Sequence, residues 1–216
     1  MSLKKLPRIE ALSIDGATWD APSDAVGRWD AAVKGAADDT TITMYDRIGS
    51  DGWTGGVTAK RVSAALRSIG SKDITVSINS PGGDFFEGLS IYNLLREHPH
   101  KVTVKVVGIA ASAASIIAMA GDEIQVAKSG FLMVHNAWAA AIGNRHDLRA
   151  AADVMERFDA SMASIYSQAA GITDKEAAAL MDAETWMTGQ EALDAGFATS
   201  LLASDEVVAD QNKANA

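Results

Sequence analysis

The sequence predicts an α/β fold built as a single domain. Strand-like and helix-like segments alternate between residues 41 and 134, and a length of 216 residues fits about one domain with additions. No linker-like segment divides the chain. We therefore expect an irregular N-terminal arm over residues 1–40, one domain over 41–203 and a flexible C-terminal tail over 204–216.

The first half of the domain alternates between the two patterns. Residues 41–45 predict a strand, and the glycines of 49–56 predict a loop. Apolar residues at helical spacing predict a helix over 62–69, and apolar alternation predicts a strand over 74–78. The further expected elements are a turn at 79–83, a helix at 84–97, a strand at 101–107, an alanine-rich helix up to 120, and short strands at 124–126 and 132–134.

The second half is dominated by one long helix. We expect it over residues 144–169, about 39 Å long at 1.5 Å per residue, and ended by Gly171. Capping-box patterns at 173–176 and 188–191 predict two further short helices. The apolar stripe of the long helix follows steps of three and four residues through Leu148, Ala152, Met155, Phe158, Met162 and Ile165.

Composition excludes several classes of function. A net charge of −9 argues against a nucleic-acid or anionic-membrane partner, and the absence of cysteine excludes disulfides, thiolate zinc sites and cysteine nucleophiles. The N-terminus lacks the apolar run of a signal peptide. The longest uncharged stretch, 106–121, is shorter than the roughly 20 residues that a membrane span needs. We expect a soluble, cytoplasmic protein.

Two turns between a strand and a helix stand out. The first is the Asn-Ser-Pro-Gly-Gly turn at 79–83, whose tandem glycines precede a helix and suit an anion or a carbonyl that gains negative charge. The second runs from 108 to 115 and presents Ser112 among small residues, with the N–H of Ala113 as a possible oxyanion donor. Taken singly, the first turn fits a mere connection between strand and helix better than a binding site. Ser112 alone likewise fits a serine packed in a buried helix better than a nucleophile.

A nucleophilic serine needs a base and an acid that orients the base. His135 ends an apolar strand and is the preferred base, while the other histidines lie in polar surroundings. Two carboxylates, Asp182 and Glu184, precede Trp186 and are candidates for the acid. Taken singly, His135 also fits a structural histidine and the two carboxylates fit solvated loop charges.

These four segments, in this order, resemble the Clp-type serine peptidases, the family of the caseinolytic protease proteolytic subunit. The matching features are the Ser-Pro-Gly-Gly turn, the Gly-x-Ala-Ala-Ser turn, the apolar strand ending in His135, and the acidic residue before Trp186 and the Glu-Ala-x-x-x-Gly segment. The match covers about residues 41–202. It implies a ClpP/crotonase-like spiral of ββα units with a long handle helix, which the 144–169 helix fits.

The resemblance implies a role for each site residue. Ser112 matches the nucleophile and His135 the general base, while Gly83 and Ala113 match the two oxyanion donors. Glu184 falls on the position that usually holds aspartate, 184 − 135 = 49 residues after the base, and Asp182 is the competitor. The implied reaction is peptide-bond hydrolysis that needs no metal and no cofactor.

The resemblance also implies partners. Phrases such as EGLSIYNLLR look closest to phage and prophage Clp-like proteins, many of which are head maturation proteases. The family forms ring homo-oligomers, which implies a heptamer or double ring that cleaves polypeptides. The partner would be an AAA+ unfoldase or phage capsid and scaffold proteins, although residues 1–40 do not clearly match the family's axial region.

Three alternatives remain open at this stage. A crotonase-like acyl-CoA enzyme would explain the glycines but gives Ser112 and His135 no joint role. A Ser–Lys peptidase would use Lys128 or Lys105 as its base. A structural ring subunit with an inactive site is the non-enzymatic alternative.

Overall fold

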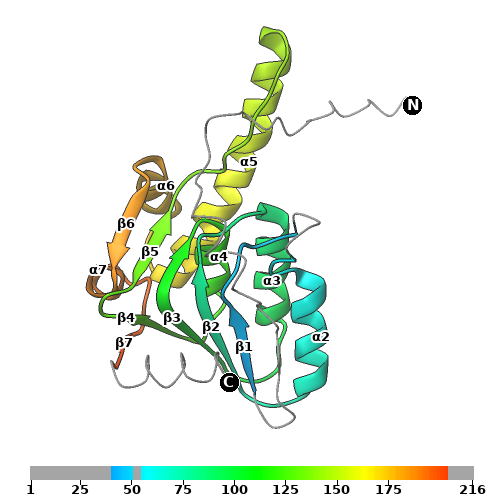
Figure 1. The fold of residues 1–216 in the computed structure, drawn as a ribbon. Helices are drawn as coiled ribbons and strands as arrows, with labels where there is room; N and C mark the ends of the chain where they lie inside the picture. The colour runs from blue at the N-terminus through cyan, green and yellow to red at the C-terminus, as the bar shows by residue number, and fades with distance from the viewer. Residues whose placement is uncertain (1–39, 51–54, 204–216) are drawn as a thin grey trace, which may run out of the picture.

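A seven-stranded sheet forms the centre of the molecule (Figure 1). The computed structural model describes residues 40–50 and 55–203. Five strands follow the order β1-β2-β3-β4-β7, and every pairing among them is parallel. Their bounds are β1 (Thr41–Met44), β2 (Ile74–Ser80), β3 (Val102–Ala111), β4 (Glu123–Ala127) and β7 (Ser200–Leu202).

The long strand β3 serves two neighbours in succession. Its first half pairs with β4, and its last three residues pair in parallel with β5 (Phe131–Val134). The outer side of β5 pairs antiparallel with β6 (Thr185–Thr188). The β5–β6 pair therefore branches from the main sheet at the carboxyl end of β3.

Helices pack against the sheet and against one another. α2 (Ala59–Ile69) packs on α3 (Phe85–Arg96), which packs on α4 (Ala113–Ala118), and α4 contacts β2 and β3. α6 (Asp174–Asp182) packs on α5 (Arg145–Ala170). α7 (Gly189–Asp194) lies against β4, β6 and β7.

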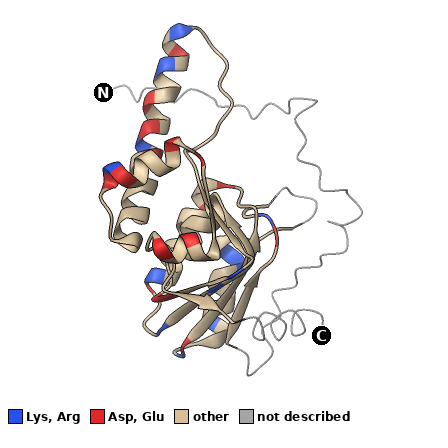
Figure 2. Ribbon diagram, turned by 90° about the vertical axis from the view of Figure 1, so that its left-hand side faces the viewer, with Lys and Arg blue, Asp and Glu red and all other residues tan. Residues whose placement is uncertain are grey.

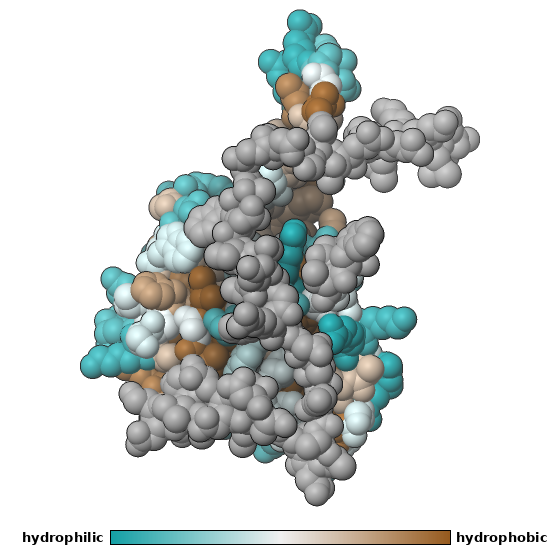
Figure 3. All heavy atoms as spheres, in the orientation of Figure 1, coloured by the Kyte–Doolittle hydropathy of each residue, from teal (hydrophilic) through white to brown (hydrophobic). Residues whose placement is uncertain are grey.

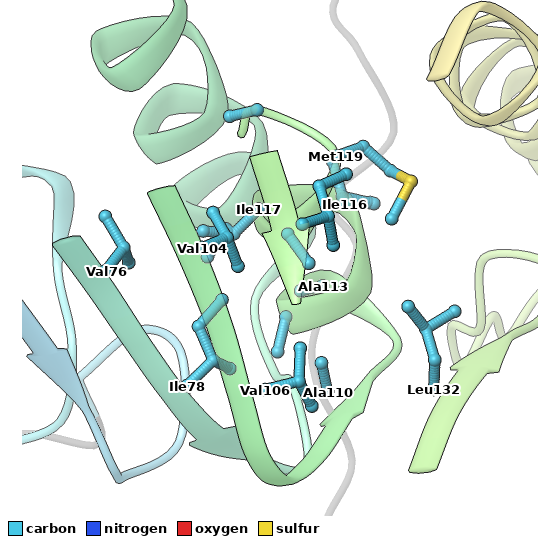
Figure 4. Close-up of a cluster of buried hydrophobic side chains, with 14 of the residues drawn as sticks. Val76, Ile78, Val104, Val106, Ala110, Ala113, Ile116, Ile117, Met119 and Leu132 are labelled. Carbon is cyan, nitrogen blue, oxygen red and sulfur yellow. The ribbon is translucent and has the colours of Figure 1, made fainter. Parts of the chain in front are cut away.

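Part of the core lies between the sheet and the short helix α4 (Figure 4). Every residue of α4 is buried, which fits its composition of alanine, isoleucine and one serine. Burying a side chain of valine or isoleucine size contributes about 1.5–3 kcal/mol, so this cluster fixes α4 firmly on β3. The labelled core side chains come from β2, β3, α4, its C-cap and β5: Val76, Ile78, Val104, Val106, Ala110, Ala113, Ile116, Ile117, Met119 and Leu132.

Helix α5 projects from the body of the molecule (Figures 1 and 2). Its C-terminal part is buried through Met162, Ile165 and Tyr166. On the projecting part, Leu148 is 46% exposed and Val154 is 42% exposed. Figure 3 shows apolar atoms directly below the hydrophilic tip of this projection. The long helix and its apolar stripe confirm the sequence prediction, and the projection has the form expected of a handle. No helix in the described ranges has the length and apolar character that a membrane span requires.

The ends of the helices follow the predicted signals. Thr173 with Glu176 and Thr188 with Glu191 form complete capping boxes at α6 and α7. Asn144 caps α5 in the same way, and Gly171 ends α5 in the left-handed conformation at φ 69°. These short sequence signals therefore set the boundaries of three helices.

Three segments differ from the sequence predictions. β3 continues through residues 108–111, which were expected to be helical, because its end pairs with both β2 and β5. β6 replaces part of a predicted loop between two helices, and β7 was not predicted. Residues 1–39 of the arm predicted over 1–40, and the whole tail predicted over 204–216, lie outside the described residues.

Candidate active site

The ends of three parallel strands meet at one edge of the sheet. Ser80 at the end of β2 is in register with Ala110, and Ala111 at the end of β3 is in register with Met133 of β5. Because the strands are parallel, the residues that follow each strand emerge at the same edge. This topology brings together the glycine turn, Ser112 and His135, which are far apart in the sequence.

Ser112 occupies a sharp turn between β3 and α4. Its backbone has φ 55° and ψ −127°, a conformation that few residues other than glycine adopt. Its N–H donates to the carbonyl oxygen of Met133, 3.1 Å away. A serine held on a strained turn from strand to helix presents its hydroxyl outward, as in a nucleophile elbow.

The hydroxyl of Ser112 meets the imidazole of His135. The Nε2 atom of His135 lies 2.8 Å from Ser112 Oγ, within hydrogen-bond distance, and both residues are half-buried. The pairing follows from the register, since His135 comes two residues after Met133, whose carbonyl holds the Ser112 N–H. This geometry allows proton transfer from serine to histidine.

The glycine turn lies directly against the Ser112 turn. A Cβ on Gly82 would stand 2.4 Å from Ala111 O and 2.7 Å from Ser112 Cβ, so only glycine fits there. Ser80 Oγ donates to Asp46 O and accepts from Gly82 N–H, which anchors the turn to the segment after β1. The tandem glycines thus serve close approach as well as chain reversal.

Two backbone N–H groups are available beside Ser112. The turn bonds to Ile48 through the carbonyl of Gly82 and the N–H of Asp84, so the N–H of Gly83 points away from Ile48. Ala113 begins α4, where the N–H groups of the first turn have no partner within the helix. Within residues 40–50 and 55–203, the N–H groups of Gly83 and Ala113 have no acceptor.

Glu184 and Asp182 lie beside the base, but neither bonds to it. In the antiparallel β5–β6 pairing Val134 faces Thr185, so one further step of the register sets Glu184 opposite His135. Glu184 adopts a left-handed conformation at φ 47°, and its Oε1 accepts from the Trp186 indole at 3.3 Å. Asp182 accepts from the Asn136 amide at 2.8 Å. The third role is therefore still a prediction.

The alternative Ser–Lys arrangement receives no support from the geometry. Lys128 is exposed in the turn after β4, and Lys105 lies within β3 beside Ser77 and Gln125. In the described part of the chain, neither lysine bonds to Ser112. Nor do three or more histidine, aspartate or glutamate side chains converge there as a metal site requires.

A buried hydroxyl pair behind Ser112 was not predicted from the sequence. Ser115 donates to the carbonyl oxygen of Ser112 at 2.6 Å and lies 2.8 Å from the hydroxyl of Tyr166. Tyr166 follows Met162 by one helical turn and so shares the buried face of α5. A buried tyrosine hydroxyl usually has a hydrogen-bond partner. The sequence therefore indicates only that Tyr166 has such a partner, not which residue it is.

A serine that contacts a histidine beside free backbone N–H groups is the arrangement of a nucleophilic serine hydrolase. Residues 26–205 match the model of the Clp protease family, a range that begins within the predicted N-terminal arm. The chain belongs to the Clp protease family, whose members are serine peptidases.

Similar proteins agree with this family. An ATP-dependent Clp protease proteolytic subunit 1 from Leifsonia xyli is 28% identical over 77% of this chain and 91% of its own length. A Bacteroides fragilis ATP-dependent Clp protease proteolytic subunit is 30% identical over 67% of this chain and 73% of its own length. A solved ClpP1 mutant from Listeria monocytogenes has a TM-score of 0.65 and 23% identity over 78% of this chain and 94% of its own chain, which establishes the shared fold.

Proposed function

We propose that this protein is a serine endopeptidase in which Ser112 is the nucleophile and His135 the general base. The observation that carries the proposal is the 2.8 Å contact between Ser112 Oγ and His135 Nε2 at the carboxyl ends of β3 and β5. In this mechanism Oγ attacks the peptide carbonyl carbon and its proton passes to Nε2. The collapsing intermediate releases the amine, which takes that proton, and water then hydrolyses the acyl-enzyme.

The proposed oxyanion hole consists of the N–H groups of Gly83 and Ala113. Both flank Ser112, and both lack an acceptor in the described residues, so they are free to donate to the oxygen of the tetrahedral intermediate. Removing one such donor elsewhere costs about 100- to 1,000-fold in kcat, which makes this the largest contribution expected of the backbone. Access is open on one side, because Gly83 is exposed.

We assign the acid that orients His135 to Glu184. Its support is the antiparallel register, which sets Glu184 opposite His135 and Asp182 two residues further along. In the structure Glu184 bonds to Trp186, so the proposed role requires its carboxylate to turn from the indole to the imidazole. Glutamate has the length to do so.

The experiment that tests the proposal is covalent labelling with a fluorophosphonate, followed by peptide mapping. Wild-type protein should be labelled at Ser112 and should cleave peptides, whereas Ser112→Ala should do neither while it keeps the wild-type fold. The expected loss is several kcal/mol of transition-state stabilisation. Ser167→Ala is the control, because Ser167 is a buried serine whose hydroxyl bonds to Ser164 and Asp174. Label on any other residue, or cleavage by Ser112→Ala, would disprove the assignment.

We further propose a ring homo-oligomer, a heptamer or double ring, that acts on polypeptides in the cytoplasm. Its support is the projecting part of α5 and the neighbouring segment, where Trp138 is 80% and Ile142 77% exposed. Exposed apolar side chains gathered on one projection are typical of an interface. The relatives named above are called subunits of ATP-dependent proteases, which suggests an AAA+ unfoldase as partner.

A phage or prophage processing role is the finer form of this proposal. Its support is the resemblance of the sequence phrases, and its substrates would be capsid or scaffold proteins. Mass spectrometry of cleavage products, with purified phage capsid and scaffold proteins as candidate substrates, tests it. Cleavage of those proteins at defined sites would support the role, and their resistance beside a readily cleaved general peptide would contradict it.

A further inference from the structure

Two side chains, Tyr166 and Ser115, form a continuous hydrogen-bonded path from α5 to the backbone carbonyl of Ser112. Ser115 Oγ lies 2.6 Å from the carbonyl oxygen of Ser112 and 2.8 Å from Tyr166 Oη. A carbonyl can only accept, so the single proton of Ser115 is donated to Ser112. The proton between the two hydroxyls must then belong to Tyr166, which donates to Ser115.

The path is sealed from water. Ser115 is 0% and Tyr166 1% exposed, and the tyrosine ring packs beside Phe197. Burial raises the pKa of the Tyr166 hydroxyl, so it keeps its proton over the working range of a peptidase. A buried hydroxyl without a hydrogen-bond partner costs free energy. The arrangement in which Tyr166 donates to Ser115 and Ser115 donates to Ser112 is therefore preferred, because it leaves no hydroxyl unpaired.

The carbonyl held by Ser115 belongs to the same peptide unit as the N–H of Ala113. A peptide unit is planar, so fixing the direction of its carbonyl fixes the direction of its N–H. The unit needs this support, because Ser112 has a strained left-handed backbone conformation that few residues other than glycine adopt. The same carbonyl also accepts from the N–H groups of Ser115 at 2.9 Å and Ile116 at 3.3 Å.

We propose that Ser115 and Tyr166 are positioning residues that aim the Ala113 N–H at the oxyanion of the tetrahedral intermediate. The inference rests on the proposed serine peptidase function of Ser112. A hydrogen bond accepted by the carbonyl also polarises the peptide unit and strengthens its N–H as a donor. Both effects act when negative charge develops, so they lower the barrier without tightening the binding of the ground-state substrate.

Four single variants test the proposal by steady-state kinetics on a peptide substrate. Tyr166→Phe should lower kcat about 3- to 10-fold, the range expected for one hydrogen bond, with KM unchanged. Ser115→Ala should lower kcat further. The matched controls are Tyr45→Phe, whose hydroxyl lies 3.0 Å from buried Ser77 on the sheet, and Ser167→Ala on α5. Both controls should keep the wild-type kcat.

A readout specific to the oxyanion hole separates positioning from a loss of stability. Affinity for a peptide boronic acid, which forms a tetrahedral adduct with the serine, should fall in parallel with kcat in Tyr166→Phe and Ser115→Ala. The double variant should have the kcat of Ser115→Ala alone, because Tyr166 acts through Ser115. It should also melt at a higher temperature than Ser115→Ala, since the unpaired phenol has been removed.

Two results would overturn the inference while leaving the proposed function intact. One is a wild-type kcat and boronate affinity in Tyr166→Phe. The other is an equal loss of kcat in Tyr166→Phe and Tyr45→Phe. A wild-type protein that neither takes the fluorophosphonate label at Ser112 nor cleaves peptides would instead overturn the proposed function, and the inference with it.

Discussion

Ser112 combines a strained backbone with an unusual number of supports. Its N–H is held by Met133, and its carbonyl is held by Ser115 and Ile116. Small neighbours accompany this arrangement, because the glycine turn closely approaches the carbonyl of Ala111, the side chain of Ser112 and the N–H of Ala113. The residue types in this turn are therefore constrained by close packing as well as by the chemistry of the site.

Substituting the proposed acid tests its role at the scale of one residue. Glu184→Gln should lower turnover by orders of magnitude, because an amide does not stabilise the imidazolium and does not select the tautomer that a carboxylate selects. Peptide hydrolysis by the purified variant measures this loss. Labelling of Ser112 should persist, since the Ser–His pair and the oxyanion donors are unchanged.

Asp182→Asn is the matched control, and it should stay within a few-fold of wild-type turnover. Asp182 accepts a hydrogen bond from Asn136, whose loss affects the neighbouring segment but not the imidazole. The reverse pattern would transfer the role to Asp182. Full activity in both variants would indicate a Ser–His dyad.

The residues of the site were predictable only in part. Ser112 and His135 were found from their places at strand ends, and the structure brings them into contact. Their contact could not follow from spacing alone, because it depends on the register between β3 and β5. The contact between Ser115 and Tyr166 was not predicted, because it joins side chains 51 residues apart and depends on how α5 packs against α4.

At the scale of elements, the capping boxes make the stability of the helix ends depend on pH. Hydrogen bonds from Thr173 and Thr188 hold the pKa values of Glu176 and Glu191 below the usual value of 4.5. A carboxyl with a depressed pKa in the folded state adds stability that is fully present above its unfolded pKa. This stability is lost as the pH falls through the folded pKa.

Glu191→Gln should therefore flatten the acid side of the stability profile. Glutamine can still cap the helix, so the free energy of unfolding at pH 7 should change little, while its decline below pH 4.5 should be less steep. Urea unfolding between pH 3 and pH 7 measures this. Glu156→Gln, at an exposed position of α5, is the control for the removal of one carboxylate. An identical slope in Glu191→Gln and wild type would contradict the account.

The elements that the sequence did not predict share one property. β6 and β7 are four and three residues long, and each exists because a partner strand stands beside it. The sequence of β6, Thr-Trp-Met-Thr, is too short to show a repeated alternation of polar and apolar residues. Short edge elements of this kind are decided by tertiary pairing, whereas α5 and the main strands carry periodic signals long enough to read.

At the scale of the whole molecule, the projection of α5 predicts assembly. Wild-type protein should be several times larger than the 22.6 kDa monomer in light scattering at micromolar concentration. Leu148→Glu should shift the population to smaller species, because it places a charge on the exposed apolar stripe.

The control for this prediction adds the same charge to another face of the same helix. Ala150 is exposed and lies about 200° around the helix from Leu148 at 3.6 residues per turn. Ala150→Glu should leave the assembly intact. A wild-type protein that is monomeric under these conditions would contradict the ring proposal.

Because the sheet branches at β3, the free energy that keeps the catalytic residues together differs from the free energy of unfolding. Ser112 follows β3, His135 follows β5, and the two strands are joined by only three register pairs from Ile109 to Ala111. If these pairs separate, the base leaves the serine while β1, β2, β3, β4 and β7 keep their own ladder. Catalytic competence therefore depends on the free energy of a local opening at this junction as well as on that of global unfolding. A small change in binding or temperature at this junction can stop turnover in a molecule that remains folded.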